Sequence, residues 1–229
     1  MKTRNALGGL LRRRECLIPS WQGLLLLMLI GIALTATAVL NIHPFLSVTA
    51  PVPAEVLVVE GWVPDYVLEE AKAEFERHPY RKLYVTGGAL ERGEHLSEYK
   101  TYADLSAATL VKMGMSNSAV EAVVAPIVQK DRTYASGLAL KHRLSVRGEA
   151  VAGINLVSFS AHARRSRFLF QRAFGDDLKV GVIAIQSREY DPGRWWAFSA
   201  GVRNVIHEFV AYIYVLVVFS AQLTHESSA

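Results

Sequence analysis

The sequence of 229 residues predicts an α/β domain with a doubly wound, mainly parallel sheet of five strands, preceded by one transmembrane helix. Short β-branched apolar runs alternate with helical patterns along the chain, which is typical of parallel sheets. These runs are almost continuously apolar, as strands covered on both faces must be. Residues 21–40 are uncharged and, as a helix, would rise about 30 Å, the thickness of a bilayer core.

The first fourteen residues carry a cluster of basic side chains directly before this apolar run. By the positive-inside rule they predict a cytoplasmic basic tail over residues 1–20 and a transmembrane anchor over 21–42. A proline-containing linker over 43–54 then leads to an extracytoplasmic domain. A cleaved signal peptide, ending near Ala38 or Ala50, is the alternative, but the apolar run is longer than a usual signal core and favours an uncleaved anchor in the cytoplasmic membrane.

Each strand and helix of the domain has its own signal. Asp65 is a candidate N-cap for a helix over 65–78, and Gly114 ends a helix predicted over 95–114. Further helices are predicted over 133–146 and after the fourth strand. The predicted strands are short apolar runs bounded by turn residues, at 55–60, 82–88, 120–124, 154–159 and 180–185.

The domain is predicted to run over residues 55–223 and to end in a hydrophobic helix over 205–223, followed by a tail at 224–229. Fifteen uncharged residues follow Glu208, fewer than the about 17–25 of a usual membrane span. A buried terminal helix is therefore favoured, and a second membrane contact is the alternative.

Composition excludes several classes of protein. Removing the five basic residues of the tail and Glu15 from the 25 basic and 21 acidic residues leaves 20 of each, so a basic nucleic-acid surface is not predicted. Cys16 is the sole cysteine and lies on the predicted cytoplasmic side, which excludes a disulfide framework or a cysteine nucleophile in the domain. No metal-ligand spacing, P-loop or dinucleotide fingerprint is present, so neither a metal nor a cofactor is predicted.

Polar and glycine residues gather directly after the strands, where doubly wound sheets bind their ligands. Arginine side chains and glycine amides there can hold an anion. A plain glycine turn at 87–88 and a simple N-cap at Thr133 are the alternatives. The candidate ligand-binding residues are Glu60, Gly61, Gly87, Gly88, Arg132, Thr133, Ser136, Ser158, Arg164 and Arg165.

His162 is the candidate catalytic residue. It stands where a strand gives way to a helix, and the positive end of the helix dipole disfavours its protonated form. A neutral imidazole there could accept a proton, with Glu98 or Asp131 orienting it. The alternative is a capping histidine on a cationic surface helix.

Four short motifs, in order, resemble the SanA/ElyC/YdcF-like family of bacterial envelope-associated proteins. They are "VVEG", "VTGG" followed by "SEY", "DRTYAS" and "SFSAHARRS", and the resemblance covers about residues 55–185. The chain departs from many relatives at Glu60–Trp62, where a glycine-rich turn is common. The resemblance implies a Rossmann-like domain and a role in cell-wall or lipid-carrier metabolism. Some relatives are associated with S-adenosylmethionine, but an exported domain has no supply of it.

The leading hypothesis is a membrane-anchored envelope-biogenesis factor, held in the lipid bilayer through residues 21–42. Its exported domain would bind a phosphorylated or otherwise anionic envelope precursor, such as a polyprenyl-phosphate-linked glycan, and could hydrolyse or transfer it. The first alternative is a non-catalytic scaffold that binds an envelope protein partner. The second is a cytoplasmic S-adenosylmethionine- or nucleotide-binding enzyme, which requires the inverted membrane topology.

Overall fold

The computed structural model describes residues 5–6, 11–12, 19–176 and 178–219. The chain divides into two compact units, Met1–Leu40 and Asn41–Ala229, and each is described by itself. In the first unit, β1 (Asn5–Ala6) pairs antiparallel with β2 (Leu11–Arg12). Residues 1–4, 7–10 and 13–18 of the predicted basic tail, which include Cys16, lie outside the described residues, as do the last positions of the predicted terminal helix and the tail at 224–229.

Helix α1 (Trp21–Leu46) has 26 residues and a mean hydropathy of 2.5, so it is long and apolar enough to cross a membrane. Its side chains are exposed over most of residues 21–40. The helix continues through Pro44 beyond the predicted boundary at residue 42. Its last residues, from Asn41 on, belong to the second unit, in which His43 and Leu46 are buried.

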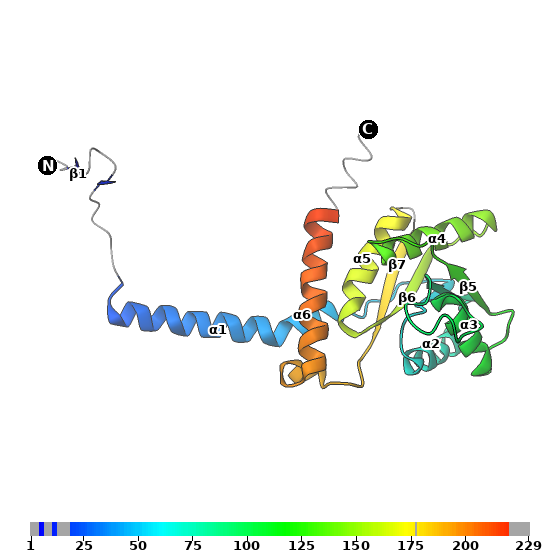
Figure 1. The fold of residues 1–229 in the computed structure, drawn as a ribbon, viewed down its shortest axis with the longest axis horizontal. Coiled ribbons are helices and arrows are strands. Elements are labelled where there is room, and N and C mark those ends of the chain that lie inside the picture. Colours follow the sequence, from blue (N-terminus) through cyan, green and yellow to red (C-terminus); the bar gives the residue numbers. More distant parts are fainter. Residues whose placement is uncertain (1–4, 7–10, 13–18, 177, 220–229) are drawn as a thin grey trace. The chain divides into compact units, whose positions relative to one another are not determined.

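The second unit is an α/β domain built on a five-stranded, all-parallel sheet, which confirms the predicted fold class (Figure 1). The strand order β5-β4-β3-β6-β7 is that of a doubly wound sheet, in which the chain first builds outward from β3 and then returns to its other side. The strands are β3 (Val56–Glu60), β4 (Lys82–Gly87), β5 (Val120–Val124), β6 (Gly153–Phe159) and β7 (Lys179–Ile185). The domain's helices are α2 (Asp65–Arg77), α3 (Tyr102–Lys112), α4 (Arg132–Val146), α5 (Ala163–Phe174) and α6 (Ser199–Tyr214), with shorter turns η2 (Ser160–His162), η3 (Pro192–Ala197) and the π-helical η4 (Val215–Phe219).

The two faces of the sheet have separate cores because successive strand residues point to opposite sides. Val56 and Val58 of β3 pack in the core under α4 and α5, whereas Leu57 and Val59 pack in the core under α2 and α3. This alternation places Glu60, the last residue of β3, on the α4 and α5 side of the sheet. The apolar row on that side therefore ends in a carboxylate.

Helix α3 begins at Tyr102, seven residues after the start predicted from the sequence, so that boundary was wrong. The Thr101 hydroxyl accepts a hydrogen bond from the Asp104 amide at 3.1 Å and donates one to the Asp104 carboxylate at 2.6 Å. This cap makes Thr101 the N-cap and fixes the start of α3 at Tyr102. At α2, Asp65 is the first helical residue and Pro64 is the N-cap, so the prediction of Asp65 as the N-cap was wrong by one position. Helix α6 likewise begins earlier than predicted, at Ser199.

The segment predicted as a linker over 43–54 is attached to the sheet. Ala50 forms an antiparallel bridge with Val182 of β7. The backbone amide of Val52 donates to the Asn155 side chain at 2.8 Å, and the Asn155 amide group donates to the Val52 carbonyl at 2.9 Å. The end of α1 and residues 47–54, which follow it, are therefore parts of the domain.

Two glycines allow α3 to begin directly on the sheet. A Cβ atom at Gly61 would lie 2.5 Å from the carbonyl oxygen of Tyr102, and one at Gly87 would lie 2.9 Å from the amide nitrogen of Ala103. Neither backbone atom can move without displacing the helix. At Gly88, by contrast, the nearest atom to such a Cβ is 4.0 Å away.

We predict that Gly61→Ala lowers the free energy of unfolding by about 1–3 kcal/mol, the range for overpacking a well-packed site. The measurement is chemical denaturation of the full-length protein in detergent. Gly88→Ala is the matched control and should leave stability unchanged or slightly raised. Equal stability of the two variants would contradict the close packing of α3 on the end of β3.

Candidate functional site

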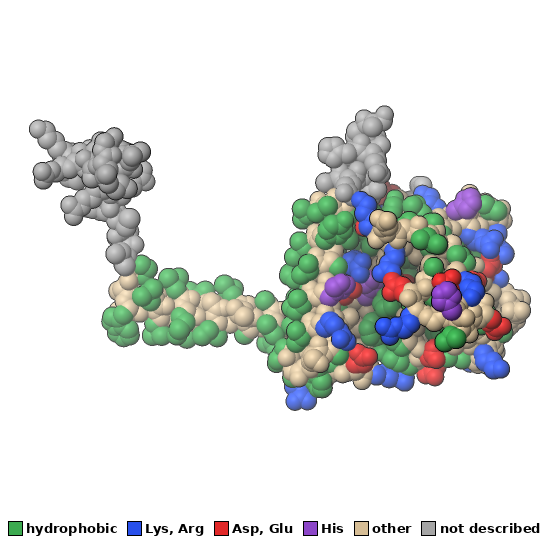
Figure 2. All heavy atoms as spheres, viewed as in Figure 1, with side chains coloured by type: hydrophobic (Ala, Val, Ile, Leu, Met, Phe, Trp, Pro, Cys, Tyr) green, Lys and Arg blue, Asp and Glu red, His purple; other side chains and the backbone are tan. Residues whose placement is uncertain are grey.

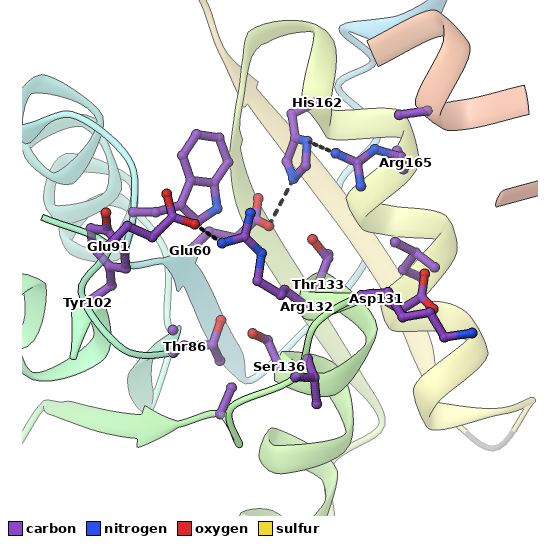
Figure 3. A pocket seen from close by; sticks show the side chains of 18 of the residues that line it. Glu60, Thr86, Glu91, Tyr102, Asp131, Arg132, Thr133, Ser136, His162 and Arg165 are labelled. Carbon is purple, nitrogen blue, oxygen red and sulfur yellow. Dashed lines mark hydrogen bonds and ion pairs between the residues drawn. The ribbon is translucent and has the colours of Figure 1, made fainter. Parts of the chain in front are cut away.

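A cavity of about 770 Å³ lies at the carboxyl ends of the strands (Figure 3). Its position matches the place where the order of the strands reverses, between β3 and β6. Nine of the residues predicted from the sequence line it, and they come from four separate chain segments: Glu60, Gly87, Gly88, Asp131, Arg132, Thr133, Ser136, His162 and Arg165.

Three neighbouring strands supply polar side chains at this edge. In the sheet register Glu60 lies beside Thr86 of β4, and Ser158 of β6 lies on the other side of Glu60. Each is the last residue in its strand to face α4 and α5 before the strand ends, after Val58, Tyr84 and Leu156 in the core. The alternation of side chains between the two faces of the sheet therefore also places Glu60, Thr86 and Ser158 side by side at the ends of their strands.

Glu60 is buried, with 3% of its surface exposed, and its carboxylate is fully hydrogen-bonded. It accepts from the Ser158 hydroxyl at 2.5 Å and from the Ser166 hydroxyl of α5 at 3.1 Å. Its Oε1 atom lies 3.3 Å from Nε2 of His162. Burial alone would raise the pKa of Glu60, but the charge of His162 and these hydrogen bonds outweigh it and lower the pKa.

His162 is the last residue of η2 and immediately precedes α5. Its Nε2 faces Glu60, and its Nδ1 lies 3.0 Å from Oε1 of Glu208 on α6. Burial opposes the charged form, but the two carboxylates outweigh burial and raise the pKa of His162 to about 9. The two carboxylates therefore favour the protonated form, contrary to the neutral imidazole expected from the helix dipole. The Trp62 ring packs edge-on against the imidazole at 5.0 Å.

Arg165 faces inward, as predicted, and binds Glu208 through two hydrogen bonds. Its Nε donates to Oε2 at 2.9 Å and its Nη2 donates to Oε1 at 3.1 Å. The same Nη2 lies 2.9 Å from Nδ1 of His162 and can donate a hydrogen bond to it when Nδ1 carries no proton, so Arg165 and Glu208 both contact this nitrogen. With Glu60, the four side chains have two negative and two positive charges. Arg165 is thus neutralised within the protein.

Glu208 is the site residue that the sequence analysis missed. It lies 43 positions after Arg165, in the segment taken as a hydrophobic terminal helix. Only 6% of its surface is exposed. A single carboxylate in an otherwise apolar helical stretch is a signal that could have identified it, since buried glutamates are rare unless paired.

The opposite wall of the cavity is formed by hydroxyl groups and the start of α4. Thr86 is 1% exposed, and within the described residues its hydroxyl has no hydrogen-bond partner. Thr133 and Ser136 lie in the first turns of α4 and, like Thr86, line the cavity. Asp131 precedes the helix with a φ of 59° and forms no side-chain cap. Amide groups in the first turn of a helix lack helical partners and favour anions.

The other predicted residues have different roles. Glu98 is exposed and lies before α3; among the described residues, the carboxylates that contact His162 are Glu60 and Glu208, not Glu98 or Asp131. Ser158 is completely buried behind Glu60 and does not line the cavity. Arg164 lies over the Phe45 ring at 4.0 Å and donates to the Phe45 carbonyl, so it faces the end of α1.

The glycines and Arg132 also differ from their predicted roles. Gly61 contacts the start of α3 and does not line the cavity, while Gly87 lines the cavity but is required for the same helix packing. Gly88 lines the cavity and has open space around its Cα. Arg132 is at the exposed rim, where it forms an ion pair with Glu91.

The raised pKa of His162 and the lowered pKa of Glu60 predict how stability depends on pH. The histidine contribution is fully present below pH 6.5, the pKa of unfolded histidine, and is lost as the pH rises through about 9. The glutamate contribution is present above pH 4.5 and is lost as the pH falls through its lowered folded pKa. Both describe one ion pair, so we expect maximum stabilisation from it between pH 4.5 and 6.5.

Chemical denaturation from pH 5 to 10 measures how much of the free energy of unfolding is lost as the pH rises, and this loss should reach about 3 kcal/mol at most. His162→Gln should be less stable at pH 6, and its free energy of unfolding should change much less between pH 6 and 10 than that of the unsubstituted protein. His78→Gln is the control, because His78 is exposed and paired with Glu74 on α2. An unchanged slope in His162→Gln would contradict the assignment of the imidazolium.

Comparison with known proteins leaves the site to be interpreted from its own geometry. A scan against protein-family models finds no match, and a search of the curated proteins finds no relative. The resemblance to the SanA/ElyC/YdcF-like family therefore rests on the four motifs and their order.

Proposed function

We propose that the protein is a membrane-anchored envelope-biogenesis factor whose α/β domain binds a phosphorylated envelope precursor in this cavity. A polyprenyl-phosphate-linked glycan is the precursor class that suits a site tethered to a bilayer. The observation that carries the proposal is the buried Thr86 hydroxyl, which lines the cavity and has no hydrogen-bond partner among the described residues. A buried hydroxyl left unpaired is unfavourable by about 1–3 kcal/mol, which a bound oxygen acceptor would offset.

The surroundings of Thr86 favour an anionic ligand. The Thr133 and Ser136 hydroxyls and the positive end of the α4 dipole face the same cavity. Arg132 lies at the rim, where a phosphate could exchange for its exposed partner Glu91. These groups form a binding wall, and the neutral ion-pair network around His162 forms the wall opposite.

The network can supply acid catalysis in hydrolysis or phosphoryl transfer. The pKa of about 9 favours the protonated form of His162 at neutral pH, and donation of its Nε2 proton to the leaving oxygen of a phosphoester requires Nε2 to leave its contact with Glu60. The proton released by the attacking water or hydroxyl group then restores the imidazolium. Glu60 and Glu208 hold the ring in place from both nitrogens and stabilise its charged form.

Location follows from the anchor and the family resemblance. Helix α1 would hold the domain at the cytoplasmic membrane and raise the local concentration of a lipid-linked substrate. The basic tail supports a cytoplasmic N-terminus and a periplasmic domain. A scaffold without a ligand would be favoured by a closed strand end with its arginines in water. The open cavity favours ligand binding instead, although Arg165 is neutralised by Glu208.

We predict that farnesyl phosphate, a short polyprenyl phosphate, binds the full-length protein in detergent and that farnesol binds at least about tenfold more weakly. Thr86→Val keeps the shape of the side chain and should weaken binding about tenfold, because one hydrogen bond to an anion is lost. Isothermal titration calorimetry measures both affinities.

Thr109→Val is the matched control for this experiment. Thr109 lies on α3, where its hydroxyl donates to the Leu105 carbonyl at 2.8 Å, and it does not line the cavity. Its affinity for farnesyl phosphate should equal that of the unsubstituted protein. Equal affinities of farnesyl phosphate and farnesol, or no effect of Thr86→Val, would refute the phosphate site.

The proposed topology predicts opposite labelling of two cysteines. In intact cells with a permeable outer membrane, a membrane-impermeant maleimide should react with Lys112→Cys, an exposed position at the end of α3, in a Cys16→Ser background. The native Cys16 of the unsubstituted chain should react only after lysis. The reverse pattern would place the domain in the cytoplasm and support the S-adenosylmethionine or nucleotide alternative.

A further inference from the structure

Helix α6 and its extension η4 expose a long apolar face. Figure 2 shows hydrophobic side chains following this helix at the edge of the domain. No charged residue occurs after Glu208 as far as Phe219. Along α6 and η4 together, seven aliphatic side chains have 41–65% of their surfaces accessible and form this apolar face: Val202, Ile206, Val210, Ile213, Leu216, Val217 and Val218.

The opposite face of the same helix is already occupied by the domain. Gly201 lies against the backbone of Trp195, and Val205 is completely buried. Val215 and Phe219 pack in a core cluster with Leu169 of α5. The two hydrogen bonds between Arg165 and Glu208 fix the helix between these apolar contacts. The exposed face therefore has no role in the domain core.

The end of the membrane-spanning candidate α1 contacts α6. Phe45, in the last turn of α1, packs edge-on against Tyr212 at 5.8 Å between ring centroids. The Arg164 guanidinium covers the same Phe45 ring, so this contact is part of the domain. A chain that leaves a bilayer through α1 consequently emerges beside α6.

The residues that precede and begin α6 suit a membrane interface. Trp196 and Phe198 are exposed, with 41% and 37% of their surfaces accessible. Arg194 and Arg203 are exposed near them. Aromatic rings at the level of the headgroups and arginines that reach lipid phosphates are the usual anchors of helices that lie in the interface.

We propose that α6 and η4 lie on the bilayer surface and bury this apolar face in its lipid, as a second membrane contact beside α1. Lipid is the occupant because the anchor of the same chain emerges at this helix and because the face carries no charged residue from Phe209 to Phe219 and begins among interfacial residues that include Arg203. The helix lies on the membrane and does not span it, since Glu208 on its other face is bound to the domain.

The position of α6 on the bilayer also determines how a ligand reaches the cavity, and this part of the inference rests on the proposed function. His207, Ala211 and Tyr214 of α6 line the cavity, and Tyr214 is also 38% exposed at the border of the apolar face. With α6 on the bilayer, the cavity is flanked by lipid along this wall. A lipid-linked phosphate then reaches the site from the membrane, while its isoprenoid chain stays in the bilayer.

The test uses the full-length protein, reconstituted into vesicles, with an environment-sensitive fluorophore on a single cysteine. In a Cys16→Ser background the label is placed at Val210→Cys or Val217→Cys, on the apolar face. Glu70→Cys, exposed on α2, is the control. We expect lipids with a quencher near the headgroup to reduce emission about twofold at 210 and 217 and to leave it unchanged at 70.

Three results would overturn the proposal. Quenching of the 210 label by aqueous iodide as efficient as at 70 would show that the face is in water. A disulfide-linked dimer through Val210→Cys, with no lipid quenching, would show that a second copy covers it. Stronger quenching at 217 by lipids labelled at the bilayer centre would show a spanning helix. Farnesyl phosphate binding in detergent is measured separately, so a failed lipid contact is distinguishable from a failed binding site.

Discussion

The ion-pair network of Glu60, His162, Arg165 and Glu208 is the interaction that holds together the end of the domain where the carboxyl ends of the strands lie. It joins three segments that are far apart in sequence, namely the end of β3, the start of α5 and the middle of α6. Buried charges are tolerated only when each is paired and hydrogen-bonded, and removing one partner commonly destabilises by about 3–5 kcal/mol. The network is electrically balanced, so no member can be lost without leaving a buried charge.

The network also explains why α6 belongs to the domain although most of its apolar residues are exposed. Apolar burial along the helix is limited to one narrow stripe, and the bidentate Arg165–Glu208 pair lies in the middle of it. A polar link of this kind fixes the rotation of the helix about its axis, because only one orientation satisfies both hydrogen bonds. The apolar face is therefore held outward by the same contacts that complete the site.

A strained turn brings His162 back over the sheet. Ser160, directly after β6, has a φ of 45°, and its hydroxyl is 2.8 Å from the Tyr190 hydroxyl and 3.4 Å from Nε2 of His43. A left-handed backbone at a non-glycine residue is unfavourable by about 1–3 kcal/mol and persists where surrounding contacts impose it. His43 belongs to the end of α1, so the end of this helix helps to hold the turn that positions the imidazole.

Local sequence signals were sufficient for the sheet and for part of the site. The strands are apolar runs ended by turn residues, and their alternation with helices predicts a parallel, doubly wound sheet, so a ligand site at the carboxyl ends of the strands could be predicted. Glu208 could not, because its partners are tertiary and its own segment is apolar. The start of α3 depended on the Thr101–Asp104 cap, which competed with a helical pattern that began earlier. The attachment of residues 47–54 depended on Asn155, a side chain inside a strand.

The distribution of charge divides the cavity into two functional halves. On the α5 and α6 side the described basic side chains that line the cavity, His162, Arg165 and His207, contact Glu60 or Glu208, so that side keeps a proton on His162 but has little net attraction for an anion. On the β4 and α4 side the hydroxyls of Thr86 and Ser136 face a helix N-terminus, where attraction comes from dipoles. A ligand that uses both halves must present an anionic group to one wall and a basic leaving oxygen to the other. A phosphoester meets that requirement, because its non-bridging oxygens carry the charge and its bridging oxygen accepts the proton.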